Sequence, residues 1–179
     1  ARWGFDDPGL TCQQYAHQLS GGMRQRALLA ICEAGSPQLI IADEPTKGLD
    51  PLLRAEAVQN LRAIVSSIHG SLLLITHDLQ VAGALTEWVA VMYAGQIVEQ
   101  GPSGVVLNTP AHPYTIGLLA SLPERGFHPI PGMAPSMADL PVGCRFRPRC
   151  RRADVHCLES PQLMSHGDNR RVRCFNPVS

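Results

Sequence analysis

Short runs of hydrophobic residues alternate with helical repeats through the first 122 residues of the chain. Largely apolar runs at 38–42 and 72–76 predict two strands, and the first has the composition of a strand buried on both faces of a parallel sheet. Since such strands alternate with helical segments, the pattern predicts an α/β fold.

Two helices are predicted around the first strand. One runs from about Gly22 to Ala34, because Ser20 is a good N-cap and Gly35 a good stop. The second begins with Asp50 as N-cap and Pro51 at the first helical position, and it ends at Gly70. The first helix has on one face Met23, Ala27, Ala30 and Ile31. The apolar stripe of the second comprises Val58, Leu61, Ile64, Val65 and Ile68.

The pattern changes beyond the second strand. Segments 88–93 and 96–99 predict a β-hairpin, and short helices are expected to begin at Ser103 and His112. His112 and Tyr114 have the pattern of residues that pack at a helix start, and we assign them no chemistry. Frequent proline and glycine then predict a linker. The predicted division is an α/β unit at 1–122, a linker at 123–143 and a cysteine-rich tail at 144–179.

Composition limits the classes of partner. The formal net charge of the 179 residues is 0, so the sequence gives no bulk attraction to nucleic acid or to a membrane surface. The apolar runs have the length of strands and fall far short of the roughly 20 residues of a transmembrane helix.

Two motifs carry the candidate chemistry. Residues 19–26 read Leu-Ser-Gly-Gly-Met-Arg-Gln-Arg, and their glycines let a phosphate approach backbone N–H groups at a helix start. The first strand ends in Asp43 and Glu44, where ligands bind in open α/β sheets, and the second ends before His77. Taken alone, each motif also fits an ordinary capped helix or a strand that simply ends in a turn.

In order and spacing these motifs resemble the signature, Walker B, D-loop and switch-histidine segments of ATP-binding-cassette (ABC) ATPases. The resemblance implies the C-terminal part of a P-loop NTPase domain that binds ATP and Mg²⁺, with a small cysteine-rich C-terminal extension. The residues expected to bind the nucleotide and its metal are Ser20, Gly21, Gly22, Gln25, Asp43 and Asp50.

The resemblance also implies the role of each acidic residue. Asp43 is expected to hold Mg²⁺ through water, and Glu44 to orient or deprotonate the attacking water. His77 occupies the position of a histidine that hydrogen-bonds the γ-phosphate, so Glu44 and His77 are the expected catalytic residues. Asp50 matches a loop that crosses to a second subunit, although helix capping alone explains it.

A P-loop is missing from the sequence. No Gly-x-x-x-x-Gly-Lys-Ser/Thr motif occurs, and Lys47 is the only lysine. A P-loop ATPase needs that glycine-rich cradle and its lysine for the phosphates. We therefore expect the chain to be the C-terminal portion of a longer subunit and to hydrolyse no ATP by itself.

The His112-Pro113-Tyr114 motif, the linker and the cysteine tail resemble the ATP-binding subunits of oligopeptide, dipeptide and nickel importers. The resemblance implies an ATPase that energises peptide uptake from the cytoplasmic face of the inner membrane, with nickel or another small solute as the alternative. The implied partners are a second ATP-binding subunit in a homo- or heterodimer, two transmembrane permease subunits and, indirectly, an extracytoplasmic solute-binding protein, with no nucleic acid. A soluble ABC ATPase of repair or translation, or a truncated non-hydrolysing binding or metal module, stays open.

The tail predicts a metal site formed by Cys144, Cys150, Cys157 and Cys174. Disulfides are rare in the cytosol, and the close cysteine pair typical of structural zinc is absent. Gaps of five, six and sixteen residues suit a [4Fe–4S] cluster, with Zn²⁺ or free thiols as alternatives. His156 or His166 can replace a ligand, and the arginines between the cysteines can offset thiolate charge or form a basic face for a partner or membrane. Cys32, inside the first helix, is expected to be buried.

Overall fold

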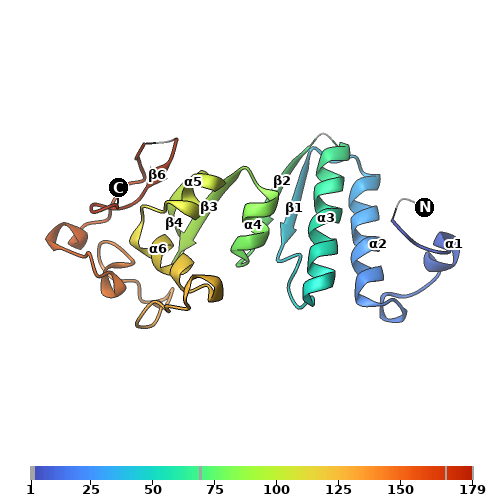
Figure 1. Cartoon of the computed structure of the whole chain (residues 1–179), viewed down its shortest axis with the longest axis horizontal. Helices are drawn as coiled ribbons and strands as arrows, with labels where there is room; N and C mark the ends of the chain where they lie inside the picture. Colours follow the sequence, from blue (N-terminus) through green and yellow to red (C-terminus); the bar gives the residue numbers. More distant parts are fainter. Residues whose placement is uncertain (1–2, 69, 168, 179) are drawn as a thin grey trace. The chain divides into compact units, whose positions relative to one another are not determined.

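The computed structural model describes residues 3–68, 70–167 and 169–178, and the side chains of Gln25 and Ile68 also lie outside the description. The chain forms two compact units, residues 1–85 and 86–179 (Figure 1). No helix in the described ranges is long and apolar enough to cross a membrane.

The first unit contains a two-stranded parallel sheet. Strand β1 (Leu39–Asp43) pairs with β2 (Ser71–Ile75), with Leu39 opposite Ser71 and Asp43 opposite Ile75. Both predicted strands are thus confirmed to within a residue at each end. The helices of this unit are α1 (Pro8–Thr11), the 3₁₀ turn η1 (Ala16–Gln18), α2 (Gly21–Ala34), α3 (Pro51–Ile68) and α4 (Leu79–Leu85).

The core of the first unit lies between the sheet and helices α2 and α3. It contains Ile40 of β1, Leu29 of α2 and Leu61 and Ile64 of α3, each at most 9% exposed. The other face of the sheet leaves its apolar side chains 48–61% exposed, namely Leu39, Ile41, Leu73 and Ile75. The prediction that the first strand is buried on both faces is therefore wrong for this chain, because the helices cover one side only.

Helix α2 confirms the predicted bounds but corrects the predicted buried face. Ile31 is 69% exposed and Leu29 is buried instead. The two residues are two positions apart, which is about 200° around a helix, so they face opposite sides. Cys32 is exposed, which contradicts the expectation that it is buried. The reason is that α2 packs mainly against α3, so much of its surface is left open.

The second unit is built on an antiparallel sheet with the strand order β3-β4-β6-β5. Strands β3 (Trp88–Tyr93) and β4 (Gln96–Pro102) form the predicted hairpin. The remaining elements are α5 (Ser103–Asn108), α6 (Pro113–Ala120), η2 (Pro123–Arg125), η3 (Arg147–Arg149), η4 (Val155–Leu158), β5 (Met164–Ser165) and β6 (Arg171–Val172). Strand β6 pairs with β4, so the tail extends the hairpin's sheet.

The core of the second unit is aromatic and includes the start of the cysteine tail. Phe146 packs edge-on against Tyr93, with ring centroids 5.2 Å apart, and both side chains are buried. Cys144 and Cys150 pack against this cluster. Arg149 bonds the carbonyls of 130 and 131 at 3.1 and 3.0 Å, which holds the proline-rich segment onto the tail. Cys144 and Cys150 are thus anchored to the folded unit.

Candidate functional site

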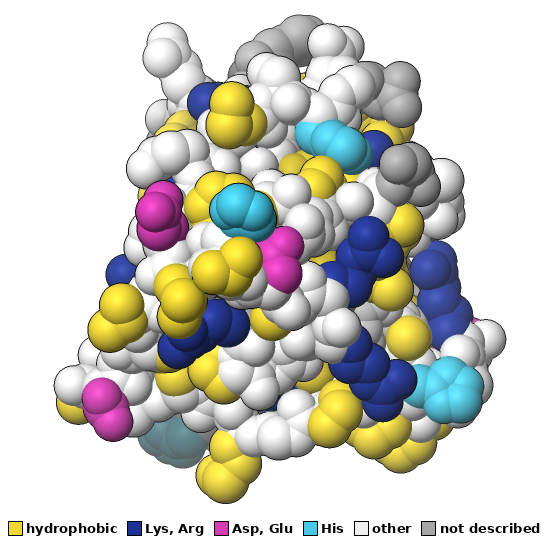
Figure 2. Space-filling view, turned by 90° about the vertical axis from the view of Figure 1, so that its left-hand side faces the viewer, with side chains coloured by type: hydrophobic (Ala, Val, Ile, Leu, Met, Phe, Trp, Pro, Cys, Tyr) yellow, Lys and Arg dark blue, Asp and Glu magenta, His cyan; other side chains and the backbone are white. Residues whose placement is uncertain are grey.

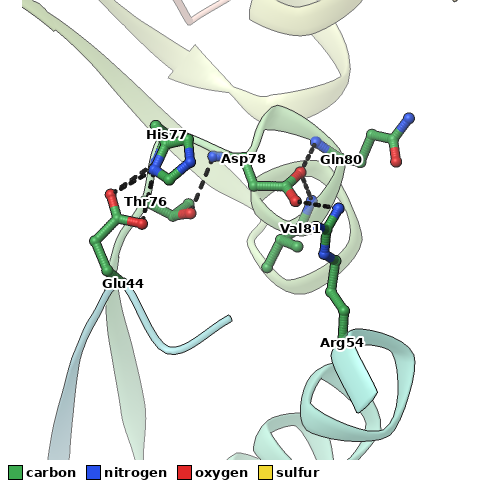
Figure 3. Close-up of polar contacts among 7 residues, drawn as sticks. All are labelled: Glu44, Arg54, Thr76, His77, Asp78, Gln80 and Val81. Atoms are coloured by element: carbon green, nitrogen blue, oxygen red, sulfur yellow. Dashed lines mark hydrogen bonds and ion pairs between the residues drawn. The ribbon is translucent and has the colours of Figure 1, made fainter. Parts of the chain in front are cut away.

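The ends of the two parallel strands bring Glu44 and His77 together (Figure 3). The Oε1 atom of Glu44 accepts the backbone N–H of His77 at 3.1 Å, and His77 Nδ1 lies 2.9 Å from Oε1 and 2.8 Å from Oε2. The backbone N–H of Glu44 donates to the carbonyl of Ile75 at 2.8 Å. Glu44 has a φ of 47°, which is uncommon for a residue other than glycine and frequent at functional sites. Strand pairing and this backbone conformation together aim the carboxylate at His77.

The pairing also determines where the hydrogen on the His77 ring lies. A carboxylate accepts only, so Nδ1 must carry the hydrogen that joins the two groups. Nε2 is then free to accept a hydrogen bond in the neutral ring, or to donate one to a phosphate oxygen when the ring is protonated. The His77 side chain is 76% exposed, so a ligand can reach it.

Asp78 fixes the position of this histidine. Its Oδ1 caps α4 by accepting the N–H groups of Gln80 at 3.0 Å and Val81 at 3.1 Å. Its Oδ2 pairs with Arg54 of α3 at 3.3 Å, and its own N–H donates to Thr76 Oγ1 at 3.0 Å. Our sequence interpretation missed Asp78 and Arg54. An Asp before an apolar helical segment is an N-cap signal that points to the first of them.

The start of α2 exposes the glycines of the signature segment. Ser20 Oγ accepts the N–H of Met23 at 3.2 Å, which confirms the predicted cap. A Cβ at Gly21 would meet nothing within 4 Å, and one at Gly22 would lie 3.7 Å from Leu53 of α3. The backbone here is open to an approaching anion. The side chain of Gln25 lies outside the described residues.

Asp50 caps α3, as predicted, by accepting the N–H groups of Leu52 at 2.9 Å and Leu53 at 3.0 Å. Asp43 is exposed at the last position of β1. The structure therefore brings Glu44 and His77 into contact, whereas Ser20 and Asp50 each bond their own helix. The nucleotide-binding roles of these residues stay predictions.

The four tail cysteines are free thiols, and two of their sulfur atoms accept backbone hydrogen bonds. The N–H of Arg152 donates to Cys150 Sγ at 3.4 Å, and the N–H of Asn176 donates to Cys174 Sγ at 3.3 Å. The N–H of Cys144 donates to the carbonyl of Cys157 at 3.0 Å. Hydrogen bonds to sulfur are among the features by which a protein tunes a metal–thiolate centre.

The four thiols influence one another. Burial raises the pKa of the Cys174 thiol to about 11, and charge on Cys144, Cys150 and Cys157 adds to this effect. Burial is also the main cause that raises the pKa of Cys150 and of Cys157. At neutral pH the three thiols with raised pKa are protonated, so a metal ion would have to displace their protons.

No group of three or more His, Cys, Asp and Glu side chains in the described ranges is arranged to hold a metal ion. The four thiols have the chemistry of a metal–thiolate centre, but three or more of them are not gathered in ligating positions. The ring of His156 lies beside Phe175 with centroids 6.4 Å apart, and His166 Nε2 lies 3.4 Å from the carbonyl of Val178.

Tail arginines have a structural role that the sequence interpretation missed. Several donate to backbone carbonyls of other segments: Arg145, Arg149, Arg152, Arg170, Arg171 and Arg173. On the face shown in Figure 2, basic side chains lie in several separate positions between hydrophobic ones. Guanidinium groups therefore tie together a tail that has little regular secondary structure.

Comparison with known proteins agrees with these features. Residues 4–47 match the family "ABC transporter", and residues 98–157 match "Oligopeptide/dipeptide transporter, C-terminal region". The oligopeptide transport ATP-binding protein AppD of Bacillus subtilis is 42% identical over 96% of this chain and 54% of its own length. The dipeptide transport ATP-binding protein DppD of Haemophilus influenzae is 40% identical over 98% of this chain and 55% of its own length.

Together, the capped signature helix, the acidic end of β1 and the first family match define a protein of the ABC ATP-binding class. The second match and the relatives are more specific. The chain belongs to the family of ATP-binding proteins of oligopeptide and dipeptide ABC transporters. It spans about half the length of the curated relatives it matches.

Proposed function

We propose that this chain supplies the signature and catalytic segments of an ATPase subunit that energises peptide uptake. The observation that carries the proposal is the Glu44–His77 contact at the ends of two parallel strands. The names of its relatives specify oligopeptide and dipeptide transport, which supports peptides as the substrate class. Nickel, or another small solute, is the alternative cargo.

In this function Glu44 orients the attacking water and accepts its proton, and Asp43 holds Mg²⁺ through water. Mg²⁺ offsets the charge of the transferred phosphoryl group when bound. His77 reaches a γ-phosphate oxygen with Nε2 only when both ring nitrogens carry hydrogen, because Nδ1 already donates to Glu44. The exposed glycine backbone after Ser20 binds the nucleotide of a second subunit, and Asp50 lies at the same junction.

The proposed assembly contains a second ATP-binding subunit and two membrane permeases on the cytoplasmic side of the inner membrane. A solute-binding protein delivers the cargo. We propose that the part of the subunit that bears the P-loop packs on the open face of β1 and β2, where four apolar side chains are exposed. Without that part, residues 1–122 bind nucleotide weakly and hydrolyse none. Residues 123–143 link them to the tail.

We further propose that the tail at 144–179 holds a metal centre, with a [4Fe–4S] cluster as the first candidate and Zn²⁺ as the second. Four thiols, two of which already accept backbone N–H groups, support it. Because no group of three or more ligands is preformed in the described residues, some of the sulfur atoms must move when the metal binds. Phosphoryl transfer needs no redox centre, so the role of the metal is structural or regulatory.

The test is a chimera in which this chain replaces the matched region of AppD from Bacillus subtilis. We expect ATP hydrolysis and oligopeptide uptake from the chimera. Glu44→Gln should lower hydrolysis by roughly 10²–10⁴-fold while ATP binding is retained, because the amide cannot accept the water's proton. Glu56→Gln, which removes an exposed carboxylate paired with Arg26, is the matched control.

Two outcomes contradict the proposal. If the Glu44→Gln chimera hydrolyses ATP as fast as the Glu56→Gln control, Glu44 is not a catalytic residue. A chimera that hydrolyses ATP but supports no oligopeptide uptake overturns the role in peptide transport while leaving the ATPase role intact.

A further inference from the structure

Two cysteine-bearing loops in the tail are built alike. In each, the residue two positions after the cysteine donates its backbone N–H to the sulfur: Arg152 to Cys150 at 3.4 Å and Asn176 to Cys174 at 3.3 Å. The loops are 24 residues apart in sequence. The same geometry at both sulfurs shows that Arg152 and Asn176 are equivalent positions in the two loops.

These two residues also bond each other. Arg152 Nε donates to the carbonyl of Asn176 at 3.2 Å, and Asn176 Nδ2 donates to the carbonyl of Arg152 at 3.2 Å. Each residue therefore holds a sulfur with its backbone N–H and the opposite loop with its side chain. This reciprocal pair fixes the separation of the two N–H···S groups.

Asn176 reaches a third cysteine through Asp154. Its Nδ2 donates to Asp154 Oδ2 at 2.9 Å, and Asp154 Oδ1 caps η4 by accepting the N–H of His156 at 2.9 Å. Cys157 lies in η4, and its backbone N–H donates to the Asp154 carbonyl at 3.2 Å. Since Cys157 in turn accepts the N–H of Cys144, one asparagine side chain connects all four cysteine positions.

We propose that Arg152 and Asn176 form a clasp that positions the sulfur atoms of Cys150 and Cys174 for joint binding of a thiophilic metal. This inference rests on the proposed metal centre. It deepens that proposal by naming residues that ligate nothing but decide how tightly the thiols bind. The closed clasp holds two of four sulfur atoms before metal arrives, which lowers the ordering cost of binding.

The test uses Asn176→Ala, which removes both side-chain bonds and keeps the backbone N–H on Cys174. Arg152→Lys removes the hydrogen bond from the guanidinium group to the Asn176 carbonyl and keeps the positive charge. Asn108→Ala and Arg171→Lys are matched controls, because each removes a comparable exposed bond to a carbonyl in the same unit. Tryptophan fluorescence and circular dichroism confirm that each variant is folded.

The first readout is the affinity of the anaerobic chain for Co²⁺, which is measured by the absorption of the Co²⁺–thiolate complex. Competition by Zn²⁺ then gives the affinity for Zn²⁺. We expect the clasp variants to lose roughly 10- to 100-fold in affinity, as is typical when residues that orient metal ligands are changed. The controls should bind like the wild type. Equal affinity in clasp variants and controls overturns the clasp.

The second readout needs no metal centre. A trivalent arylarsenoxide joins two nearby thiols by forming two As–S bonds, and its oxygen leaves as water with the two thiol protons. Wild-type chain should give the Cys150–Cys174 adduct, identified by mass spectrometry, and Asn176→Ala should form it several-fold more slowly. If the wild type binds no Co²⁺, Zn²⁺ or iron, the proposed metal centre fails, and an adduct rate unchanged by Asn176→Ala then overturns the clasp as well.

Discussion

Glu99 offers the sharpest test of how the second unit is held together. Its carboxylate is completely buried in β4 and accepts the N–H groups of Ala111 at 2.8 Å and His112 at 2.9 Å, one on each oxygen. Arg170, 7% exposed, lies 3.6 Å away. The acid thereby joins the sheet to the start of α6 and balances a buried cation.

Glu99→Gln keeps the shape and removes the charge. The amide oxygen can still accept one N–H, but its NH₂ group must face the other, so one charge-assisted bond worth roughly 1.5–3 kcal/mol is lost. Arg170 is also left without its countercharge. Breaking a buried pair from one side costs roughly 3–5 kcal/mol in all. This is a large part of the roughly 5–15 kcal/mol that stabilises a whole domain.

Urea unfolding followed by Trp88 measures the effect. Trp3→Phe leaves Trp88, in β3, as the only tryptophan, so its fluorescence reports the second unit. With a slope near 2 kcal/mol per molar urea, the midpoint should fall by about 2 M. Glu87→Gln, an exposed acid in the same unit, should change stability by less than about 0.5 kcal/mol. Adding Arg170→Met to Glu99→Gln should recover part of the loss, because no buried charge is then left unpaired.

A midpoint shift below about 0.5 M for Glu99→Gln would refute this account of the buried pair, since it corresponds to about 1 kcal/mol. The account would also be refuted if the double variant lost as much stability as Glu99→Gln and Arg170→Met together. Effects on the free energy of unfolding add for independent residues, but not for two residues that form a pair.

Two further predictions concern the same unit. Burial lowers the pKa of His112 to about 4, so the unfolded chain binds a proton more readily than the folded one between pH 6.5 and 4. Stability should fall by about 3 kcal/mol as pH drops through this window, and His112→Asn should abolish most of that slope in urea titrations at each pH. Gly143 has a φ of 82°, and a Cβ there would lie 2.5 Å from the Cys157 carbonyl. Gly143→Ala should therefore destabilise by roughly 3 kcal/mol or more in urea unfolding, whereas Gly104→Ala, with open space in α5, should not.

The sequence predicted best what depends on few neighbouring residues. The caps formed by Ser20 and Asp50 need only a side-chain oxygen two or three positions before a free N–H, and both are present. The hairpin at 88–99 needs only its turn and two apolar strands. The positions of Glu44 and His77 directly after two apolar strands were also visible in the sequence, and the parallel pairing of β1 with β2 brings the two residues together.

The tail could not be predicted in this way. Strand β6 has two residues and carries no periodicity, so its pairing with β4 leaves no trace in the pattern. The arginine bonds to carbonyls depend on which segments meet in space, and any arginine can make them. The bonds between Arg152 and Asn176 are of this kind, so the sequence showed four cysteines as a candidate metal-binding set but not the residues that bond two of their sulfur atoms.

The errors about burial have one physical origin. Residues 38–42 have the composition of a strand covered on both faces, and the structure covers one, leaving Leu39 and Ile41 more than half exposed. Cys32 on α2 is open for the same reason. Hydrophobic composition reflects the surroundings in which a segment is stable, whereas exposure depends on which elements are present to cover it. The open apolar face of β1 and β2 is therefore the physical ground for our proposal that a P-loop-bearing part packs there.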